Sequence, residues 1–320
     1  MRRVTRISRL HRRLRSERGA SAVMAGILMI PLIGGLAIAL DVGALYAERA
    51  QLQNGADAAA LAVAQACAEG SCGDAASIAT LYADDNANDG AANVLEVGFP
   101  SPNSVTVTTS TRTSDGGDAL RHPFASLLGI DSTTVAATAT AEWGGLASGS
   151  VFPMALSLCE FTASGAADGQ RVTIRTDTNM KCKHDGIEVP GGFGWLDQST
   201  PCEVAIDLSG PEVWLGSQPG NSVPGPCKGV LPGLIGTTVV FPVYDGSRGN
   251  GQNAAYRISG FAAFHLTGYR FSGLSSTDPA APACSGNCRG IQGYFDRWVS
   301  LEGTPGGRPP LNAYAVALTG

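Results

Sequence analysis

The hydrophobic pattern near the N-terminus predicts one long helix that can cross a membrane. Residues 20–40 form a run of 21 residues without a charged side chain. In an α-helix, which rises about 1.5 Å per residue, this run is about 31 Å long and matches a hydrocarbon core of about 30 Å. Pro31 and the pair Gly34-Gly35 fall inside the run. Membrane helices tolerate both residue types, so these positions indicate a kink, close helix packing or simply a flexible anchor.

The helical pattern continues beyond the apolar run. Apolar residues at spacings of seven, four, three and four share one helical face, namely Leu45, Leu52, Ala56, Ala59 and Val63. Alanine, which has the highest helix propensity, is abundant as far as residue 68. A narrow alanine face permits close packing, either against the chain's own globular part or against a second copy or a partner helix. The sequence leaves both alternatives open.

The charge distribution sets the expected orientation of this helix. Eight of the 22 basic residues and one of the 27 acidic residues precede position 20, which leaves 14 basic and 26 acidic residues and a net charge of −12 on the remainder. Arginine is enriched on the cytoplasmic side of membrane helices, so residues 1–19 are expected to form a basic cytoplasmic leader that binds anionic lipid headgroups. The acidic remainder argues against nucleic-acid binding, which needs a basic surface.

A cleavable signal peptide is the main alternative to a retained anchor, because both begin with a basic region and an apolar core. Apolar residues continue past Leu40 at Val42, Leu45 and Tyr46, where a signal peptide would have its cleavage site. We therefore expect a retained, single-pass transmembrane helix over residues 20–47, with the bulk of the chain extracytoplasmic.

The segment after the membrane, residues 48–143, is expected to combine a helical stalk with a small α+β domain. The first helix ends near residue 68, and a cysteine-flanked turn leads to a second helix over residues 75–86. β-branched residues predict strands over residues 104–113 and 132–142, with a short helix over residues 119–128 between them. The two strands can pair into a small sheet packed on the membrane-proximal helix, a pilin-like layout.

The C-terminal part, residues 151–320, is expected to be a β-rich domain, so that the whole chain belongs to the α+β class. Residues 144–150 have the Gly/Ser composition of a linker. After them, short apolar runs alternate with Gly, Pro, Asn and Asp turns, a rhythm typical of β structure. Residues 256–271 hold five aromatic side chains and are expected to form a central strand pair, whereas residues 246–253 are expected to be a mobile loop.

Eight cysteines, all beyond the apolar run, predict up to four disulfides in an oxidising compartment. The sequence does not fix their pairing, and a local pattern is the expectation: Cys67–Cys72, Cys159–Cys182, Cys202–Cys227 and Cys284–Cys288. The alternative is a zinc site, but neither of the two close pairs has a nearby histidine. We therefore expect a disulfide-stabilised domain with no metal and no cofactor.

The residues around the apolar run occur in a distinctive order. Glu17-Arg18-Gly19-Ala20 enters the run, Pro31 lies within it and Asp41-Val42-Gly43 follows, and then come Arg49, Gln51-Leu52-Gln53 and the string Asp-Ala-Ala-Ala-Leu-Ala over residues 57–62. This order resembles the N-terminal module of the TadE/TadG-like proteins of the Tad (Flp) pilus-assembly system, over about residues 17–66. The rest of the chain is similar to the region C-terminal to that module in TadG-related proteins.

The resemblance implies a structural or assembly component of a Tad-type pilus or secretion apparatus, held in a bacterial cytoplasmic membrane with its N-terminus inside. Its expected partners are membrane lipid and, through the N-terminal helix, other Tad/Flp pilus-assembly proteins or a second copy of the chain. The residues expected to make helix–helix contacts are Asp41, Gly43, Arg49, Gln51, Ala56, Asp57 and Ala59.

Two departures from the family's pattern refine this expectation. Pilin-like members are cleaved after a glycine and carry glutamate at the fifth position that follows, but the fifth residue after Gly19 is Met24, so the leader is expected to stay. Some TadG proteins have a von Willebrand factor A domain with an Asp-x-Ser-x-Ser metal loop. The nearest string here, from Asp207 to Pro211, lacks the second serine, and no metal site is expected there.

The chain lacks the familiar catalytic motifs. It has no Gly-x-Ser-x-Gly elbow, no His-Glu-x-x-His and no phosphate-binding loop, so an enzyme is not expected. The alternative to an assembly role is a surface-displayed binding protein or adhesin that uses the β-rich domain. An anchored hydrolase would need a Ser/His/Asp cluster in a deep pocket.

Overall fold

A computed structural model of the chain describes residues 17–164, 169–176, 178–198, 201–218, 220, 222–250, 253–306, 308 and 310–319. Most of the expected leader, residues 1–16, lies outside the described residues. The remaining chain forms two compact units. Among the described residues, unit 1 consists of residues 17–56, 80–95 and 108–138, and unit 2 consists of residues 57–79, 96–107 and those between 139 and 319.

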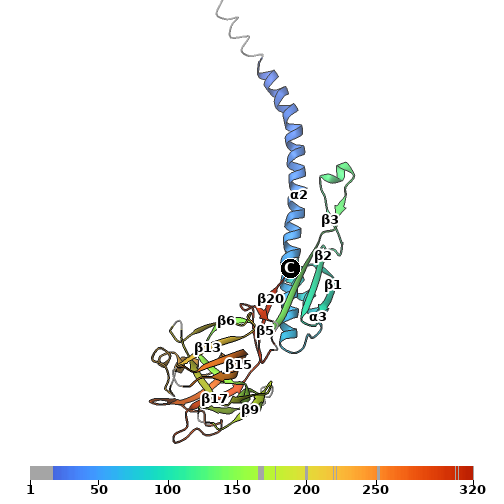
Figure 1. Cartoon of the computed structure of the whole chain (residues 1–320). Helices are drawn as coiled ribbons and strands as arrows, with labels where there is room; N and C mark the ends of the chain where they lie inside the picture. Colours follow the sequence, from blue (N-terminus) through green and yellow to red (C-terminus); the bar gives the residue numbers. More distant parts are fainter. Residues whose placement is uncertain are drawn as a thin grey trace, which may run out of the picture. The chain divides into compact units, whose positions relative to one another are not determined.

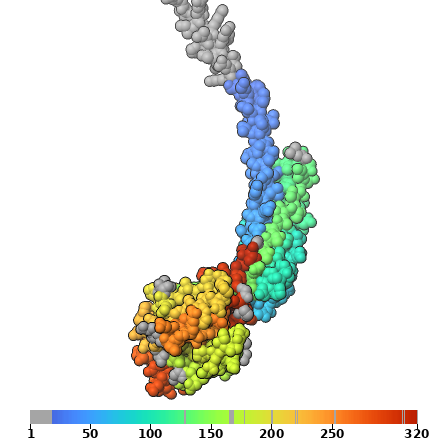
Figure 2. All heavy atoms as spheres, viewed as in Figure 1, coloured from blue at the N-terminus to red at the C-terminus, as the bar shows by residue number. Residues whose placement is uncertain are grey.

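The predicted N-terminal helix is confirmed as α2, which runs over 52 residues from Glu17 to Ala68 and contains Pro31. Its large apolar side chains from Val23 to Leu40 are each more than half exposed. Figure 2 shows the first turns of α2, in blue, free of any other coloured segment. Within the described part of the chain, α2 is the one helix that is long and apolar enough to cross a membrane. So large an exposed apolar surface is unfavourable in water and favourable in lipid.

Seven further elements contribute to unit 1 (Figure 1): α3 Ala75–Asp85, β1 Ala92–Ser101, β2 Ser104–Thr111, β3 Leu120–Arg121, the 3₁₀ turn η1 Ala125–Leu128, β4 Ser132–Thr133 and β5 Ala136–Leu146. The predicted second helix corresponds to α3, and the two predicted strands correspond to β2 and β5. These two strands are neighbours, as expected, in a sheet of order β1-β2-β5-β20-β18.

Two expectations for this region are corrected. The helix expected over residues 119–128 is limited to η1, because His122 precedes Pro123 and a residue before proline is disfavoured in helical conformation. Residues 120–121 instead pair with residues 132–133 as a short antiparallel ladder. Strand β1 was not expected, since Gly98 and Pro100 interrupt its pattern. Its place at the end of the sheet accommodates the proline, which cannot donate a hydrogen bond to a neighbour.

Small residues hold α2 close to the rest of unit 1. Leu52 lies in a buried cluster with Ala83, Ala92 and Ala137. A Cβ atom added at Gly55 would lie 3.4 Å from the Cα atom of Ala83, so only a residue of minimal size allows α3 to approach this closely. Part of the alanine-rich face predicted from the sequence is therefore used inside the chain.

Unit 2 contains the remaining strands and short helices: β6 Ser148–Val151, β7 Met154–Ser157, α4 Leu158–Ala163, β8 Val172–Arg175, β9 Lys181–His184, β10 Ile187–Pro190, β11 Phe193–Leu196, β12 Val204–Asp207, β13 Val213–Gln218, η2 Gly225–Lys228, η3 Leu231–Leu234, β14 Thr238–Arg248, β15 Ala255–Phe271, β16 Leu274–Ser276, β17 Gly290–Phe295, β18 Trp298–Ser300, β19 Pro305–Gly306 and β20 Ala313–Leu318. The predicted β-rich C-terminal part is thus confirmed.

Five strands of unit 2 close into a ring. Their order is β13-β11-β7-β14-β15, and β13 pairs again with β15, as in the pair Val213 and Ile258. Strand β15 continues beyond the ring, where Phe264 pairs with Phe295 of β17. Residues 256–271 therefore belong to one 17-residue strand, which corrects the expected strand pair. Strand β14 extends to Arg248, so the first part of the expected loop over residues 246–253 is strand as well.

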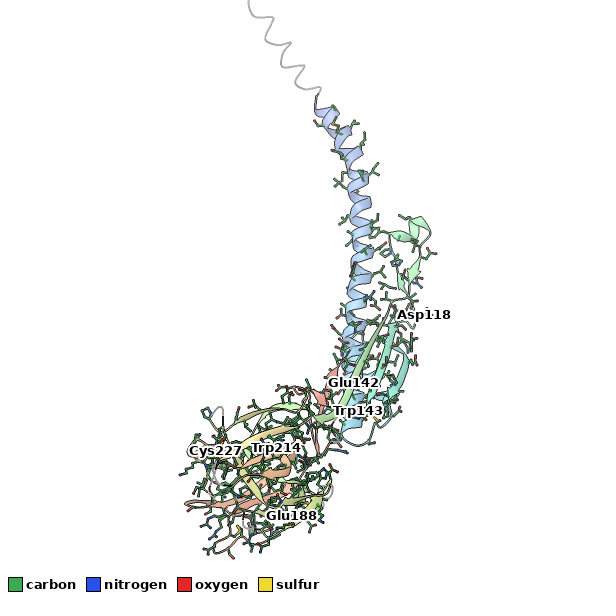
Figure 3. The ribbon with its side chains drawn as sticks, in the orientation of Figure 1. Asp118, Glu142, Trp143, Glu188, Trp214 and Cys227 are labelled. Carbon is green, nitrogen blue, oxygen red and sulfur yellow. A yellow bond between two sulfur atoms is a disulfide. The ribbon has the colours of Figure 1, made fainter. Side chains whose placement is uncertain are left out.

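Aromatic side chains fill the larger buried cluster of unit 2. The rings of Phe152 and Trp195 meet edge to face with centroids 5.7 Å apart. Phe264 and Phe295, which pair across β15 and β17, have centroids 5.1 Å apart. Such contacts favour burial of these rings over exposure to a ligand. Figure 3 labels Trp214 on β13 and Cys227 on η2 in the same unit.

The expected linker over residues 144–150 is wrong, because these residues lie largely in β5 and β6. A Cβ atom at Gly144 would lie 2.9 Å from the backbone oxygen of Gly306, and one at Gly145 would lie 3.0 Å from that of Arg308. The glycines therefore permit close approach of the chain near β19 rather than flexibility.

The local disulfide pattern is confirmed at all four pairs: Cys67–Cys72, Cys159–Cys182, Cys202–Cys227 and Cys284–Cys288. Cys67 lies in the last turn of α2, and its bond closes the turn that follows the helix. The bond between Cys159 and Cys182 joins α4 to β9. These bonds restrict the unfolded chain and so stabilise the fold.

Candidate functional site

Asp41 is the first charged residue after the apolar run, and its carboxylate is buried. The residue is 5% exposed. Its Oδ2 atom accepts hydrogen bonds from the backbone N–H groups of Phe124, at 3.2 Å, and Ala125, at 2.5 Å. Its Oδ1 atom has no hydrogen-bond partner among the described residues. Asp41 thus contacts the segment around η1 of its own chain, and the contact uses hydrogen bonds to an ionisable side chain, which are stronger than neutral ones.

The other residues expected to make helix–helix contacts divide into two groups. Ala56 and Ala59 are fully buried, and Gln51 Oε1 accepts a hydrogen bond from the N–H of Asn88 at 2.9 Å. Asp57 is half-buried and has partners in the structure. Gly43 and Arg49 are exposed. The structure therefore favours packing within the chain for the alanines, and it leaves Gly43 and Arg49 at the surface.

The face of α2 near residue 50 is held by polar contacts as well. Thr109 Oγ1 donates a hydrogen bond to the carbonyl oxygen of Leu52 at 2.9 Å. Gln53 Nε2 donates to the carbonyl oxygen of Thr138 at 3.3 Å. Burial raises the pKa of the Glu48 carboxyl, although a hydrogen bond from Thr111 opposes the effect. These contacts fix the rotation of α2 about its axis relative to β2 and β5 of unit 1.

Unit 1 also has an open groove between α2 and the start of β5. Val42, Leu45, Tyr46 and Arg49 line one side, and residues 133–136 line the other. Its volume is about 420 Å³. Tyr46 is 73% exposed, and an exposed aromatic side chain shortly after an apolar helix is typical of a membrane interface.

Sequence reasoning missed an apolar surface on the segment between β3 and β4. Phe124, Leu127 and Ile130 are 38%, 85% and 54% exposed. The signal that could have revealed it is the absence of any charged residue between Arg121 and Asp131. The link to Asp41 could not be read from the sequence, because 83 residues separate Asp41 from Phe124.

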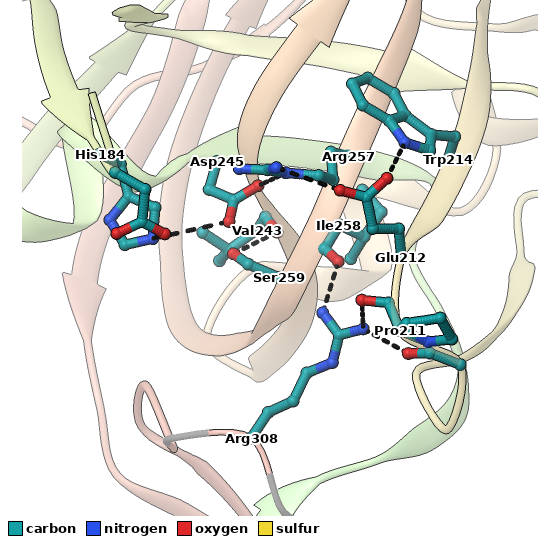
Figure 4. A network of polar contacts seen from close by, with 12 residues as sticks. His184, Pro211, Glu212, Trp214, Val243, Asp245, Arg257, Ile258, Ser259 and Arg308 are labelled. Carbon is teal, nitrogen blue, oxygen red and sulfur yellow. Dashed lines mark hydrogen bonds and ion pairs between the residues drawn. The ribbon is translucent and has the colours of Figure 1, made fainter. Parts of the chain in front are cut away.

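A polar network on unit 2 joins β9, β13, β14 and β15 (Figure 4). Asp245, which is 7% exposed, accepts a hydrogen bond from Arg257 Nε at 2.6 Å. That hydrogen bond raises the pKa of the guanidinium. Arg257 also contacts Glu212 at 3.4 Å, and the ring of His184 lies 3.6 Å from Asp245. The acidic and basic groups thus pair with one another, as in an ion-pair network that supports a fold.

The string from Asp207 to Pro211 is held by an arginine. Arg308 donates hydrogen bonds to the carbonyl oxygens of Gly210 at 2.8 Å and Ile258 at 3.1 Å (Figure 4). Asp207 accepts a hydrogen bond from the N–H of Ser209, which lowers the pKa of its carboxyl. In the described residues, no group of three or more His, Cys, Asp or Glu side chains is placed to hold a metal ion.

One cavity of unit 2 has a volume of about 470 Å³ and mostly apolar walls. Its lining includes Phe152, Val239 and Trp298 together with Glu203 and Glu302. This size and composition suit a small, partly apolar ligand.

A comparison with protein families found a match whose position coincides with the exposed helix. A family described as "Putative Flp pilus-assembly TadE/G-like" matches residues 19–66. Comparisons with curated proteins and with solved structures found no match. The matched residues contain the apolar run, Asp41 and the buried alanines of α2. The N-terminal module of this chain, residues 19–66, is therefore similar to the TadE/G-like Flp pilus-assembly family, and together with the apolar helix this similarity indicates a membrane-anchored protein.

Proposed function

We propose that this chain is a structural or assembly component of a Flp-type pilus or secretion apparatus and that it acts through protein contacts rather than catalysis. The observation that carries the proposal is the coincidence of the family match with the exposed apolar helix, at residues 19–66. A helix that served only as a lipid anchor would need the apolar run but not the landmarks that come after it, such as Asp41 and Asp57.

In this proposal α2 spans the bacterial cytoplasmic membrane once, with residues 1–19 in the cytoplasm. The eight arginines of the leader support this orientation, because positive charge is retained on the cytoplasmic side. The four disulfides support an oxidising compartment for the rest of the chain. The bulk of units 1 and 2 is then extracytoplasmic.

The proposed contact with pilus components uses the exposed part of α2. A Cβ atom added at Gly34, Gly35 or Gly43 would meet nothing within 4 Å, so these backbone positions are open to a close approach by another helix. Ala56 and Ala59 are buried in the chain itself, and they would act by fixing α2 rather than by touching a partner.

Co-purification from cells that make the other pilus components tests this proposal. Replacement of Gly34 and Gly35 by leucine is expected to remove partner proteins from the purified complex, because leucine blocks a close helix contact. Ala22→Leu, an exposed change on the opposite side of the same helix, is the matched control and is expected to retain the partners. Unchanged complexes from both variants would contradict a contact at this position. Recovery of the chain from the medium without residues 1–40 would contradict the anchor itself.

The cavity beside Trp298 supports the second candidate, a surface-displayed binding protein. Its volume of about 470 Å³ and its mixture of aromatic and acidic lining suit a small ligand. Binding of the full chain in nanodiscs to a glycan panel tests this candidate. Binding that is lost in Trp298→Ala and retained in Trp214→Ala would support it, and the absence of any binding would count against it.

A further inference from the structure

The segment from β3 to β4, residues 120–133, is a short projection that we call the finger. Its base is the antiparallel ladder in which Leu120 pairs with Thr133 and Arg121 pairs with Ser132. Nine consecutive residues between Arg121 and Asp131 carry no charged side chain at neutral pH when His122 is neutral. The finger therefore has charged residues at its base and an uncharged tip.

The tip is ordered by backbone hydrogen bonds although its side chains are exposed. Gly129 adopts a left-handed conformation, with φ 82°, and its N–H bonds to the carbonyl oxygen of Ser126. The N–H of Ile130 bonds to the carbonyl oxygen of Ala125. Leu127 is nevertheless 85% exposed and Ile130 is 54% exposed. Exposed apolar side chains gathered on an ordered projection indicate a contact that the isolated chain does not supply.

Asp41 fixes the finger against α2. Its carboxylate accepts hydrogen bonds from the backbone N–H groups of Phe124 and Ala125, at the start of the turn η1. At the base, His122 is 4% exposed, and its Nε2 atom lies 2.8 Å from Thr133 Oγ1. Figure 1 shows the finger alongside α2, beyond the label of β3. The position of the tip along the helix is thus set by Asp41.

This position coincides with the end of the apolar run. Residues 20–40 precede Asp41 without a charged side chain. On α2 itself, Ile38 and Leu40 before Asp41 and Val42 after it are exposed. The side chains of the finger therefore extend an apolar surface that begins on the helix, at the level where the helix leaves the hydrocarbon core.

We propose that the finger is a membrane-contact element, and that Phe124, Leu127 and Ile130 enter the interfacial layer of the leaflet into which α2 emerges. Apolar side chains of interfacial elements bury themselves about 5–10 Å into the boundary between headgroups and acyl chains. Arg121 and Asp131 then lie at headgroup level. A second attachment beside α2 fixes the rotation and tilt of the helix, and so the direction in which the rest of unit 1 faces. The proposal rests on the membrane anchor of the proposed function.

A fluorescent label at three single positions tests the proposal on the full chain in lipid nanodiscs. All eight native cysteines are disulfide-bonded, so an introduced cysteine is the one free thiol. Leu127→Cys reports on the finger and Leu36→Cys on the apolar run. Ser114→Cys, an exposed turn position of the same unit, is the matched control. The label is an environment-sensitive NBD group, and the quenchers are nitroxide-labelled phosphatidylcholine in the bilayer and iodide in the buffer.

The lipid quencher is expected to lower emission at position 127 at least about threefold more than at position 114, because position 127 lies within the interfacial layer. Quenching at position 36 but not at position 127 would overturn the finger proposal and leave the anchor intact. No lipid quenching at position 36 would overturn the anchor. Protection of position 127 from iodide without lipid quenching would indicate a protein cover, such as a second copy, and would also overturn the proposal.

A change at Asp41 tests how the finger is positioned. In Asp41→Ala the label at position 127 is expected to lose at least about half of its lipid quenching, since the two hydrogen bonds that hold η1 against the helix are lost. Asp131→Ala, which removes an exposed carboxylate from the same finger, is the control and is expected to keep the quenching. Equal quenching in both variants would refute the role of Asp41.

Discussion

Asn312, which directly precedes β20, has a side chain that joins three backbone segments, and its removal gives a sharp test of how unit 2 is held together. The residue is 6% exposed. Its Oδ1 atom accepts the N–H of Ala263 on β15 at 2.7 Å. Its Nδ2 atom donates to the carbonyl oxygens of Ala263 and Asp296, each at 2.8 Å. The side chain thus positions β20 against β15 and against the end of β17.

The cost of Asn312→Ala is set by the groups left behind. The carbonyl oxygen of Ala263 keeps the hydrogen bond from the N–H of Asp296, but the N–H of Ala263 and the carbonyl oxygen of Asp296 lose their partner. Three lost hydrogen bonds at a net value of about 1 kcal/mol each give a loss of about 3 kcal/mol in the free energy of unfolding. For a domain of this size, that loss lowers the melting temperature by about 6–12 °C.

Tryptophan fluorescence of the full chain in nanodiscs, heated without reducing agent, measures this change, because Trp195 is buried in the core of unit 2. Asn103→Ala, at an exposed turn of the same unit, is the control. Asn312→Asp keeps an acceptor for Ala263 but turns a carboxylate oxygen toward two carbonyls. The carbonyls raise the pKa of this carboxyl in the folded variant. The Asn312→Asp variant is therefore more stable at low pH, and its stability falls as the pH rises through that pKa. A decrease below about 2 °C in Asn312→Ala, equal to the control, would refute this account.

Three further predictions concern other parts of the molecule. Ala59→Leu overfills a fully buried position of α2 and is expected to cost about 1–3 kcal/mol of stability, as measured by thermal unfolding. The control Ala50→Leu, at an exposed position, should leave stability unchanged. Loss of partner binding by a stably folded Ala59→Leu variant would instead indicate that Ala59 contacts the partner directly. Burial raises the pKa of the Glu160 carboxyl above its ordinary value near 4.5. The stability that this group contributes is therefore present below pH 4.5 and is lost as the pH rises through its pKa in the folded chain. Glu160→Gln, which can still accept the N–H of Gly192, should flatten this dependence in urea titrations, and an unchanged slope would contradict the assignment. Replacement of both Cys159 and Cys182 by serine should lower stability by about 2–4 kcal/mol, because the bond closes a loop of 23 residues, and a melting curve equal to that of the native chain would show that the bond is dispensable.

Sequence patterns revealed the elements whose signal is local. The apolar run and the alanine-rich face predicted α2, and β-branched residues predicted β2 and β5. The disulfide pairs also agreed with local spacing, because the largest separation between paired cysteines is 25 residues. Each of these features depends on residues that are close together in the chain, so a single sequence contains the necessary information.

Features that depend on distant residues were missed. Residues 256–271 were expected to form a strand pair but belong to one strand, β15. A Cβ atom at Gly260 would lie 3.1 Å from Leu311 and one at Gly268 would lie 2.7 Å from the nitrogen of Asp278. Close approach of another segment, rather than a turn, requires glycine there. In the candidate site, the position of Asp41 was read correctly as the end of the apolar run. Its hydrogen bonds to η1 could not be foreseen, because they join residues more than 80 positions apart.

The order of the disulfides has a consequence for how the chain matures. The four bonds join the cysteines strictly in succession, at sequence separations of 5, 23, 25 and 4, and no bond crosses or encloses another. When the part of the chain after α2 crosses the membrane in sequence order, each cysteine meets its correct partner before the next pair emerges. Oxidation can then proceed vectorially with little need for an isomerase, because the slow reshuffling of wrong pairs is avoided.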